Sequence, residues 1–285
     1  MSIVIEGLTH VYMQDSPFES TAIADVNLTL EPGEFVGIIG HTGSGKSTLI
    51  QHINGLLKPS AGRILVEGED IAAKDYDRQK LRRAVGLVFQ YPEHQLFEET
   101  VEKDVAFGPR NLKLPEEEIA ARARAALERV GLPYEEIKDR SPFELSGGQK
   151  RRVAIAGVLA MQPSTLILDE PTAGLDPRGR DEILALTRQL HREGETIVLV
   201  THNMSDIARV ATRIVVMSHG RVAMDGAPEQ VFRQRERLRE AGLDVPDSVK
   251  LYEALQGRGI ALPRMPLTLE QLAALILETR GDGHA

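Results

Sequence analysis

The chain has 285 residues, of which 42% are hydrophobic and 27% are charged, and its formal net charge is −8. This composition is ordinary for a globular protein, and the length suits one large domain with an appendage or two modest domains. The acidic balance argues against bulk electrostatic binding of nucleic acid, so we expect no nucleic-acid partner. The chain contains no cysteine, which excludes disulfides, thiolate catalysis and Cys-ligated metals.

The hydrophobic stretches give no sign of a membrane span. The first residues lack a basic region followed by an apolar core, so we expect no signal peptide. The apolar or glycine run at residues 153–161 is far shorter than the roughly 20 residues that a membrane helix requires. We therefore expect a cytoplasmic protein, or one that docks on a membrane component.

The N-terminal region predicts β structure. Residues 3–5 and 26–30 form short strand-like runs, and residues 15–20 between them have the composition of a loop. Residues 35–39 are a continuous apolar run, as expected for a strand buried on both faces. This strand leads into a glycine-rich segment, and residues 46–56 then predict a helix.

The glycine-rich segment matches the pattern G-x-x-x-x-G-K-[ST] and predicts a phosphate-binding loop. Its glycines allow backbone N–H groups to surround phosphates, and the following helix N-terminus adds partial positive charge. We expect Lys46 to reach the β- and γ-phosphates and Ser47 to ligate Mg²⁺. The predicted nucleotide-binding residues here are Gly40, His41, Thr42, Gly43, Ser44, Gly45, Lys46, Ser47 and Thr48.

The next buried strand, residues 85–89, ends at Gln90. A neutral amide at this edge of the sheet can contact Mg²⁺ and an attacking water. The segment that follows, residues 91–99, carries two aromatic side chains, a leucine and several glutamates. We expect this segment, with Glu93 among its acidic residues, to dock a membrane partner. The alternative is that Leu96 and Phe97 only pack under the helices that follow.

Two further features lie in the middle of the chain. Residues 115–130 predict an amphipathic helix, with Pro115 near its N-terminus and Gly131 just past its end. The motif Leu-Ser-Gly-Gly-Gln follows at residues 145–149. A serine hydroxyl and glycine amides at a helix N-terminus are well suited to hold a γ-phosphate.

Residues 165–168 and 196–200 predict buried strands, and residues 181–192 predict a helix between them. This order implies a parallel sheet with right-handed crossovers. Asp169 and Glu170 follow the first strand, where Asp169 can hold Mg²⁺ through water and Glu170 can polarise the attacking water. His202 follows the second strand, and the topology places it beside the γ-phosphate. In a sequence that lacked a phosphate-binding motif, two acidic residues and a histidine after buried strands would be interpreted as ordinary loop residues with no catalytic role.

The composition changes after about residue 232. Residues 233–240 are highly charged and are interpreted as the solvated face of a helix, and residues 248–256 and 269–279 are helix-like. We predict a main domain at residues 1–237, with a helical subdomain at about residues 91–160. Residues 238–285 are predicted to be a small helical extension that supports a dimer.

The ordered motifs resemble the nucleotide-binding subunit of ATP-binding cassette (ABC) transporters over about residues 3–230. The resemblance implies an α/β P-loop NTPase cassette, with a RecA-like parallel-sheet core, an N-terminal antiparallel β region, a helical subdomain and a small helical C-terminal extension. It implies ATP and Mg²⁺ as cofactors. The implied catalytic residues are Glu170, His202 and Gln90, and the implied metal-binding residues are Ser47, Gln90 and Asp169.

The same resemblance implies a head-to-tail dimer that holds two ATP molecules between its chains. Each site would combine the phosphate-binding loop of one chain with a clamp from the other, formed by Ser146, Gly147, Gly148 and Gln149. Tyr12 matches an aromatic residue that stacks on adenine, although a core aromatic at a strand end is the alternative. Asp176 matches a loop that contacts the other chain, but the family often has serine where Ala173 stands.

A closer resemblance is to the ATPases of energy-coupling factor transporters, and it is carried by residues 89–109, 151–161 and 242–246. These prokaryotic importers of vitamins or transition-metal ions pair two such ATPases with a transmembrane coupling protein and a small substrate-binding membrane protein. We therefore expect an ATP-hydrolysing motor bound peripherally at the cytoplasmic face of the cell membrane. The alternatives are the ATPase of a cobalt or nickel importer of the same group and, remotely, a soluble non-transport ABC ATPase. The transported substrate stays open, as does the choice between a homodimer and a heterodimer.

Overall fold

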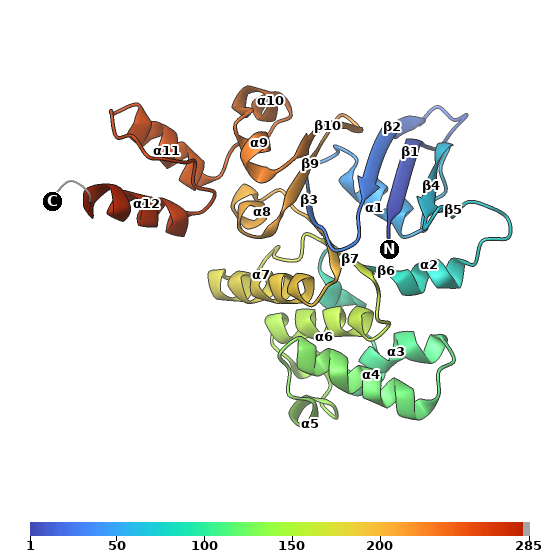
Figure 1. Cartoon of the computed structure of the whole chain (residues 1–285). Coiled ribbons are helices and arrows are strands. Elements are labelled where there is room, and N and C mark those ends of the chain that lie inside the picture. The colour runs from blue at the N-terminus through green and yellow to red at the C-terminus, as the bar shows by residue number, and fades with distance from the viewer. Residues whose placement is uncertain (282–285) are drawn as a thin grey trace.

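Two β-sheets organise the computed structural model, which describes residues 1–281 (Figure 1). The smaller sheet has the strand order β2-β1-β4-β5, and its neighbouring strands are antiparallel. Its strands are β1 (Ile3–Tyr12), β2 (Ser20–Leu30), β4 (Ala61–Val66) and β5 (Glu69–Asp70). We predicted only short pieces of β1 and β2; both strands are longer because they pair with each other from Ile3↔Leu30 to Tyr12↔Ser20.

The larger sheet has the order β10-β9-β3-β8-β7-β6 and is parallel except for its edge strand β10. Its strands are β3 (Phe35–Ile39), β6 (Val85–Val88), β7 (Thr165–Asp169), β8 (Thr196–Val200), β9 (Arg213–Ser218) and β10 (Arg221–Gly226). The predicted parallel sheet is therefore confirmed. Figure 1 shows helices on both sides of it.

Most of the helices lie between the strands along the chain, and the last of them follow the final strand. The first seven are α1 (Lys46–Ile53), α2 (Arg78–Ala84), α3 (Val101–Asn111), α4 (Glu116–Arg129), α5 (Tyr134–Ile137), α6 (Gly147–Leu159) and α7 (Pro177–Arg192). The others are α8 (Met204–Val210), α9 (Pro228–Phe232), α10 (Arg235–Glu240), α11 (Asp247–Gln256) and α12 (Leu269–Gly281), with short 3-10 turns η1 (Pro92–Gln95) and η2 (Pro142–Glu144). Helices α3 to α6 lie together on one side of the molecule (Figure 1). No helix in residues 1–281 is long and apolar enough to cross a membrane.

The strand β3 is buried along its whole length, as its continuous apolar sequence predicts. Phe35 and Ile39 pack into the larger core cluster, whereas Val36 and Ile38 pack into the cluster under the smaller sheet. Side chains of a strand point alternately to its two faces, so both faces of the sheet are covered. The segment that follows Ile39 is thereby fixed at the carboxyl edge of the sheet.

Helix α1 ends at Ile53, three residues before the predicted end. Asn54 donates from its side chain to the backbone oxygen of Val85 at 2.7 Å, and Gly55 follows with a φ of 73°. A glycine in the left-handed conformation is a common helix terminator because it has no Cβ to clash. Gly55 thus terminates the helix, and Asn54 attaches the end of the helix to β6.

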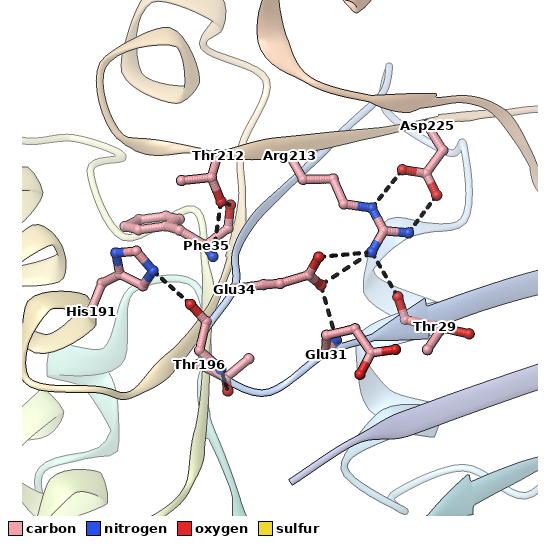
Figure 2. A network of polar contacts seen from close by, with 10 residues as sticks. Thr29, Glu31, Glu34, Phe35, His191, Thr196, Thr212, Arg213 and Asp225 are labelled. Carbon is pink, nitrogen blue, oxygen red and sulfur yellow. Dashed lines mark hydrogen bonds and ion pairs between the residues drawn. The ribbon is translucent and has the colours of Figure 1, made fainter.

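A polar network around Arg213 connects the two sheets (Figure 2). The guanidinium of Arg213, in β9, donates to both carboxylate oxygens of Asp225 at 2.7 and 2.6 Å, and to the backbone oxygen of Thr29, in β2, at 2.9 Å. It also donates to Glu34, just before β3, at 3.1 Å. These carboxylates raise the pKa of Arg213, with the hydrogen bonds to Asp225 as the largest cause. The network therefore fixes the turn that leads into β3.

The chain beyond α9 has two parts. Leu238, Ala241, Val245 and Val249 belong to the larger core cluster, so α10 and the start of α11 pack on the main body. A separate small cluster contains Leu262, Leu272 and Leu275. The predicted boundary between residues 237 and 238 thus falls inside α10, and residues 282–285 of the predicted extension lie outside the described part of the chain.

Candidate active site

A cavity of about 600 Å³ lies beside the phosphate-binding loop. Its walls come from six parts of the chain: the end of β1, the start of β2, the loop with α1, and the segments that follow β6, β7 and β8. The lining residues are Tyr12, Ser20, Thr21, Ala22, Thr42, Gly43, Gly45, Lys46, Ser47, Thr48, Gln90, Asp169, Glu170 and His202. The structure therefore brings together most of the residues that the sequence predicts for one nucleotide site.

The path of the loop requires glycine at two positions. A Cβ on Gly40 would lie 2.4 Å from the backbone oxygen of Met217. Gly45, which precedes α1, has a φ of 99°, and a Cβ there would lie 2.6 Å from Cγ2 of Ile23. Any other residue at these positions would clash with the neighbouring strands, so the glycines keep the loop close to the sheet.

Lys46 lies inside the curve of the loop. Its Nζ donates to the backbone oxygens of Gly40 at 2.7 Å and His41 at 3.0 Å. Burial lowers the pKa of Lys46, while the negative charges of Glu170 and Asp169 act in the opposite direction. The ammonium group is thus placed where it can exchange backbone oxygens for phosphate oxygens.

Ser47 and Asp169 form an oxygen pair at the floor of the cavity. The hydroxyl of Ser47 donates to Oδ2 of Asp169 at 3.4 Å. Burial and the charge of Glu170 raise the pKa of Asp169 to about 6, although Ser47 and Lys46 oppose this shift. A hydroxyl and a carboxylate are ligands that Mg²⁺ prefers, so this donor set fits the ion that the sequence predicts.

Glu170 is held by the end of the neighbouring strand. Its φ is 48°, and its N–H donates to the backbone oxygen of Val200 at 2.8 Å. Its carboxylate accepts from the hydroxyl of Thr201 at 3.1 Å and from the backbone N–H of His202 at 3.0 Å, and it lies 2.7 Å from Nδ1 of His202. Glu170 and His202 thus form one hydrogen-bonded unit at the cavity wall.

Tyr12 and Gln90 lie at the margins of the cavity. Tyr12 is the last residue of β1, remains 41% exposed, and its hydroxyl lies 3.3 Å from that of Thr48. A partly exposed aromatic ring at this place can stack on a planar base. Gln90 is exposed and also lines a second cavity of about 380 Å³, together with Tyr91, Glu170 and residues 172–175.

The motif at residues 145–149 lies elsewhere. Ser146 caps α6: its hydroxyl accepts from the N–H of Gln149 at 3.3 Å, and the side chain of Gln149 accepts from the N–H of Ser146 at 3.1 Å. A Cβ on Gly147 or Gly148 would meet nothing within 4 Å. Within residues 1–281, none of these residues lines the 600 Å³ cavity, so a single chain does not join this helix N-terminus to its own phosphate-binding loop. Asp176 is likewise exposed and caps α7 through the N–H of Gly179 at 2.7 Å.

Our expectation for residues 91–99 needs correction at two positions. Glu93 is not directed toward a partner, because its carboxylate accepts from the buried Arg151 at 3.1 and 2.9 Å. Leu96 is only 8% exposed and belongs to the larger core cluster, as the alternative interpretation predicts. Phe97, in contrast, is 57% exposed.

Several residues of the site were missed from the sequence. Thr201 directly precedes His202, so the strand-end argument that found His202 could have found it too. The start of β2, at Ser20, Thr21 and Ala22, reaches the cavity only through its pairing with β1, which leaves no local signal. The pairing of Arg151 with Glu93 also has no sequence signature, because it joins segments 58 residues apart.

Known proteins resemble this chain in sequence along most of its length. The family model described as ABC transporter matches residues 23–173. The chain is 58% identical over 279 residues to the energy-coupling factor transporter ATP-binding protein EcfA2 of Clostridium tetani, covering 98% of this chain and 97% of that protein. It is 56% identical to the protein of the same name in Symbiobacterium thermophilum, covering 97% and 96%.

Two solved structures are similar as well. One is cbiO1 of Clostridium perfringens, described as part of the ABC transporter complex cbiONQ, with a TM-score of 0.73, 44% identity, and coverage of 84% of this chain and 94% of that one. The other is the dimeric ATP-binding cassette MJ0796 in a post-hydrolysis state bound to ADP and Pi, with a TM-score of 0.68, 32% identity, and coverage of 79% and 98%.

Proposed function

The chain belongs to the ABC transporter family, in the group of energy-coupling factor ATP-binding proteins, and on that premise we propose that it is the ATP-hydrolysing motor of an energy-coupling factor importer. The observation that carries this proposal is the cavity in which Lys46, Asp169, Glu170 and His202 meet. It combines a cation for phosphates, an oxygen pair for a metal ion and a carboxylate that can activate water.

Each residue has a role that follows from its position. Lys46 and the N–H groups of the loop and of α1 bind the phosphates of ATP, and Tyr12 stacks on the base. Glu170 accepts a hydrogen bond from the attacking water and withdraws its proton. Thr201 and His202 hold the carboxylate of Glu170 in place, since the hydroxyl of Thr201 and the backbone N–H of His202 both donate to it.

Ser47, Asp169 and Gln90 are the residues that would hold Mg²⁺. When bound, this ion neutralises charge on the phosphates. The hydroxyl of Ser47 and the carboxylate of Asp169 already lie next to each other, and Gln90 lines the same cavity. Gln90 directly precedes residues 91–99, the segment that we assign to partner docking, so a movement of Gln90 on nucleotide binding would be passed on to that segment.

The site is complete only in a head-to-tail dimer. At the helix N-terminus that Ser146 caps, a Cβ on either glycine would meet nothing within 4 Å, and within residues 1–281 this N-terminus does not line the cavity at the phosphate-binding loop of its own chain. We assign it to the nucleotide of a second ATPase chain, where its N–H groups and hydroxyl would contact the γ-phosphate. The similar cassette MJ0796 is described as a dimer, which supports this arrangement.

The membrane partners in this proposal are a transmembrane coupling protein and a small substrate-binding membrane protein. Phe97 and Phe107 are 57% and 44% exposed and their rings are in contact, so together they offer an apolar surface for such a partner. The chain would then be bound at the cytoplasmic face of the membrane. A cobalt or nickel importer of the same group is the alternative, because the site residues would be the same and cbiO1 is a similar structure.

The test is to isolate the full chain from membranes, identify every associated protein, and measure ATP hydrolysis by the complex.

Glu170→Gln removes the carboxylate that activates water but keeps the phosphate contacts. We expect hydrolysis to fall by roughly 10²–10⁴-fold while ATP binding is retained. Glu229→Gln, an exposed substitution in α9, serves as the matched control and should hydrolyse ATP like the parent. Parent-like hydrolysis by Glu170→Gln would contradict the role of this residue, and isolation without any membrane protein would contradict the importer assignment.

A further inference from the structure

Arg151 is a fully buried cation outside the nucleotide cavity. Only 1% of its surface is exposed, and it lies in the second turn of α6, five residues after Ser146. A charged side chain in such a place requires partners for its charge and for its hydrogen-bond donors. Its partners come from two other segments of the proposed site.

The first partner is Glu93. The Nε of Arg151 donates to Oε2 of Glu93 at 3.1 Å, and a terminal nitrogen donates to Oε1 at 2.9 Å. This is a two-point contact of the kind that fixes the orientation as well as the distance of both groups. Glu93 lies in η1, three residues after Gln90, and its own side chain is 18% exposed.

The second partner is the backbone that follows Glu170. The other terminal nitrogen of Arg151 donates to the backbone oxygens of Pro171 at 2.9 Å and Ala173 at 2.8 Å. Between these two residues, the hydroxyl of Thr172 donates to the buried Asp206 at 2.9 Å. Residues 171–173 are therefore held from both sides, by α6 through Arg151 and by α8 through Asp206.

One guanidinium thus joins the segment after Gln90, the segment after Glu170 and the helix whose N-terminus is Ser146. We propose that Arg151 and Glu93 are positioning residues for ATP hydrolysis, which keep these three segments in one fixed arrangement. The inference rests on the proposed function, because it assigns the effect of the pair to Glu170 and to the clamp at Ser146. Neither residue lines the nucleotide cavity, so the pair acts through its neighbours and not on ATP.

A positioning role predicts a different result from a purely structural one. Small displacements of catalytic groups reduce turnover strongly while leaving substrate binding intact. Loss of structure alone would instead reduce the number of folded sites, with unchanged turnover at each remaining site. The ratio between the effects on kcat and on ATP affinity therefore distinguishes the two roles.

The experiment uses the full chain in its complex and compares Glu93→Gln, Glu93→Asp and Arg151→Lys with the parent. Glu93→Gln keeps the shape but removes the charge, and Arg151→Lys keeps the charge but cannot reach both Glu93 and the two backbone oxygens. We expect kcat to fall at least about tenfold in Glu93→Gln and Arg151→Lys, with the Kd for ATP changed by less than about twofold. Glu93→Asp, which retains the carboxylate, should recover more of kcat than Glu93→Gln.

Glu118→Gln is the matched control, since it removes a carboxylate that pairs with Arg122 at 2.6 Å on α4 and is partly exposed. This variant should keep the kcat of the parent. Parent-like kcat in Glu93→Gln would overturn the inference, as would a loss of ATP binding in proportion to activity or failure of both Glu93→Gln and Arg151→Lys to fold. If the parent complex itself does not hydrolyse ATP, the proposed function fails; if only the pair variants behave like the parent, the positioning role alone fails.

Discussion

His52 is a buried imidazole on the helix that follows the phosphate-binding loop. It has no exposed surface, and neither ring nitrogen has a hydrogen-bond partner within residues 1–281. Its ring lies edge-on to that of His10 at 4.7 Å between centroids, and His10 in turn contacts Tyr12 at 4.4 Å. The wall that carries Tyr12 is therefore supported by the packed rings of His10 and His52.

Burial, with a smaller contribution from His10, lowers the pKa of His52 from 6.5 to about 4. Between these values the unfolded chain binds a proton at this position and the folded chain does not. The stabilisation by neutral His52 is thus present above pH 6.5 and is lost as the pH falls to about 4, by roughly 3 kcal/mol in total. We expect His52→Leu to lack this part of the acid sensitivity, as measured by denaturant unfolding at pH 7, 5.5 and 4.5. His94→Gln, which alters an exposed histidine, should keep the parent profile, and an unchanged profile in His52→Leu would show that His52 is not the responsible group.

At the scale of elements, the two helix N-termini of the proposed site belong to different chains. Lys46 begins α1, and Ser146 caps α6. In a homodimer, mixing a Lys46→Ala chain with a Ser146→Arg chain leaves one composite site intact in each mixed dimer and none in either parental dimer. Equal mixing should then restore roughly a quarter of the parent ATPase activity if the two sites act independently.

The control mixture combines Lys46→Ala with a chain that carries both substitutions. It contains no intact site in any dimer, so its activity should stay at the level of Lys46→Ala alone. Full activity of Ser146→Arg by itself would contradict a clamp that acts between chains. Activity that rises in the first mixture but not in the control mixture therefore shows that the two chains share a site, and that mixing an inactive chain with another chain is not sufficient by itself.

The elements that the sequence predicts best are those with strong local patterns. The run at residues 35–39 and the helix at residues 115–130 match β3 and α4 closely, because continuous apolar character and a one-sided apolar face are local properties. The helix predicted at residues 181–192 begins earlier, at Pro177, since Asp176 caps it and proline suits the first helical position. Strands β4, β9 and β10 were not predicted. Strands β4 and β9 are defined by pairing with the distant strands β1 and β3, and β10 in turn pairs with β9 across a short turn.

The candidate site shows the same division. Most of the residues that meet at the cavity were found because they follow a buried parallel strand or belong to the glycine-rich motif, whereas Tyr12 was found only through the family resemblance and residues 20–22 were missed. The contacts of Arg151 with Glu93 and of Thr172 with Asp206 could not be found, because each depends on side-chain packing between separate elements. A sequence pattern identifies which residues face a ligand more readily than which residues hold them in place.

At the scale of the whole molecule, the docking surface is the feature that we propose to connect the ATPase to its membrane partner. We define it by Phe97 and Phe107, whose rings meet edge-to-face at 4.9 Å between centroids. They are 57% and 44% exposed, and Phe97 is separated by only a few residues from Gln90 at the nucleotide cavity. An aromatic pair of this kind is a suitable anchor for an apolar segment of a partner.

Replacing both Phe97 and Phe107 with serine should therefore weaken assembly without affecting nucleotide binding. Truncated aromatic anchors at interfaces commonly cost 2 kcal/mol or more, so we expect the recovered membrane partners to fall by at least roughly tenfold. Neither side chain lines the nucleotide cavity, and ATP binding by the isolated chain should consequently match the parent. Phe18→Ser is the control, because Phe18 is 77% exposed in the turn between β1 and β2, far along the chain from this surface. Normal recovery of the partners by the double variant would place the docking surface elsewhere, whereas a loss shared with Phe18→Ser would point to a general effect of exposed aromatics and not to a defined contact.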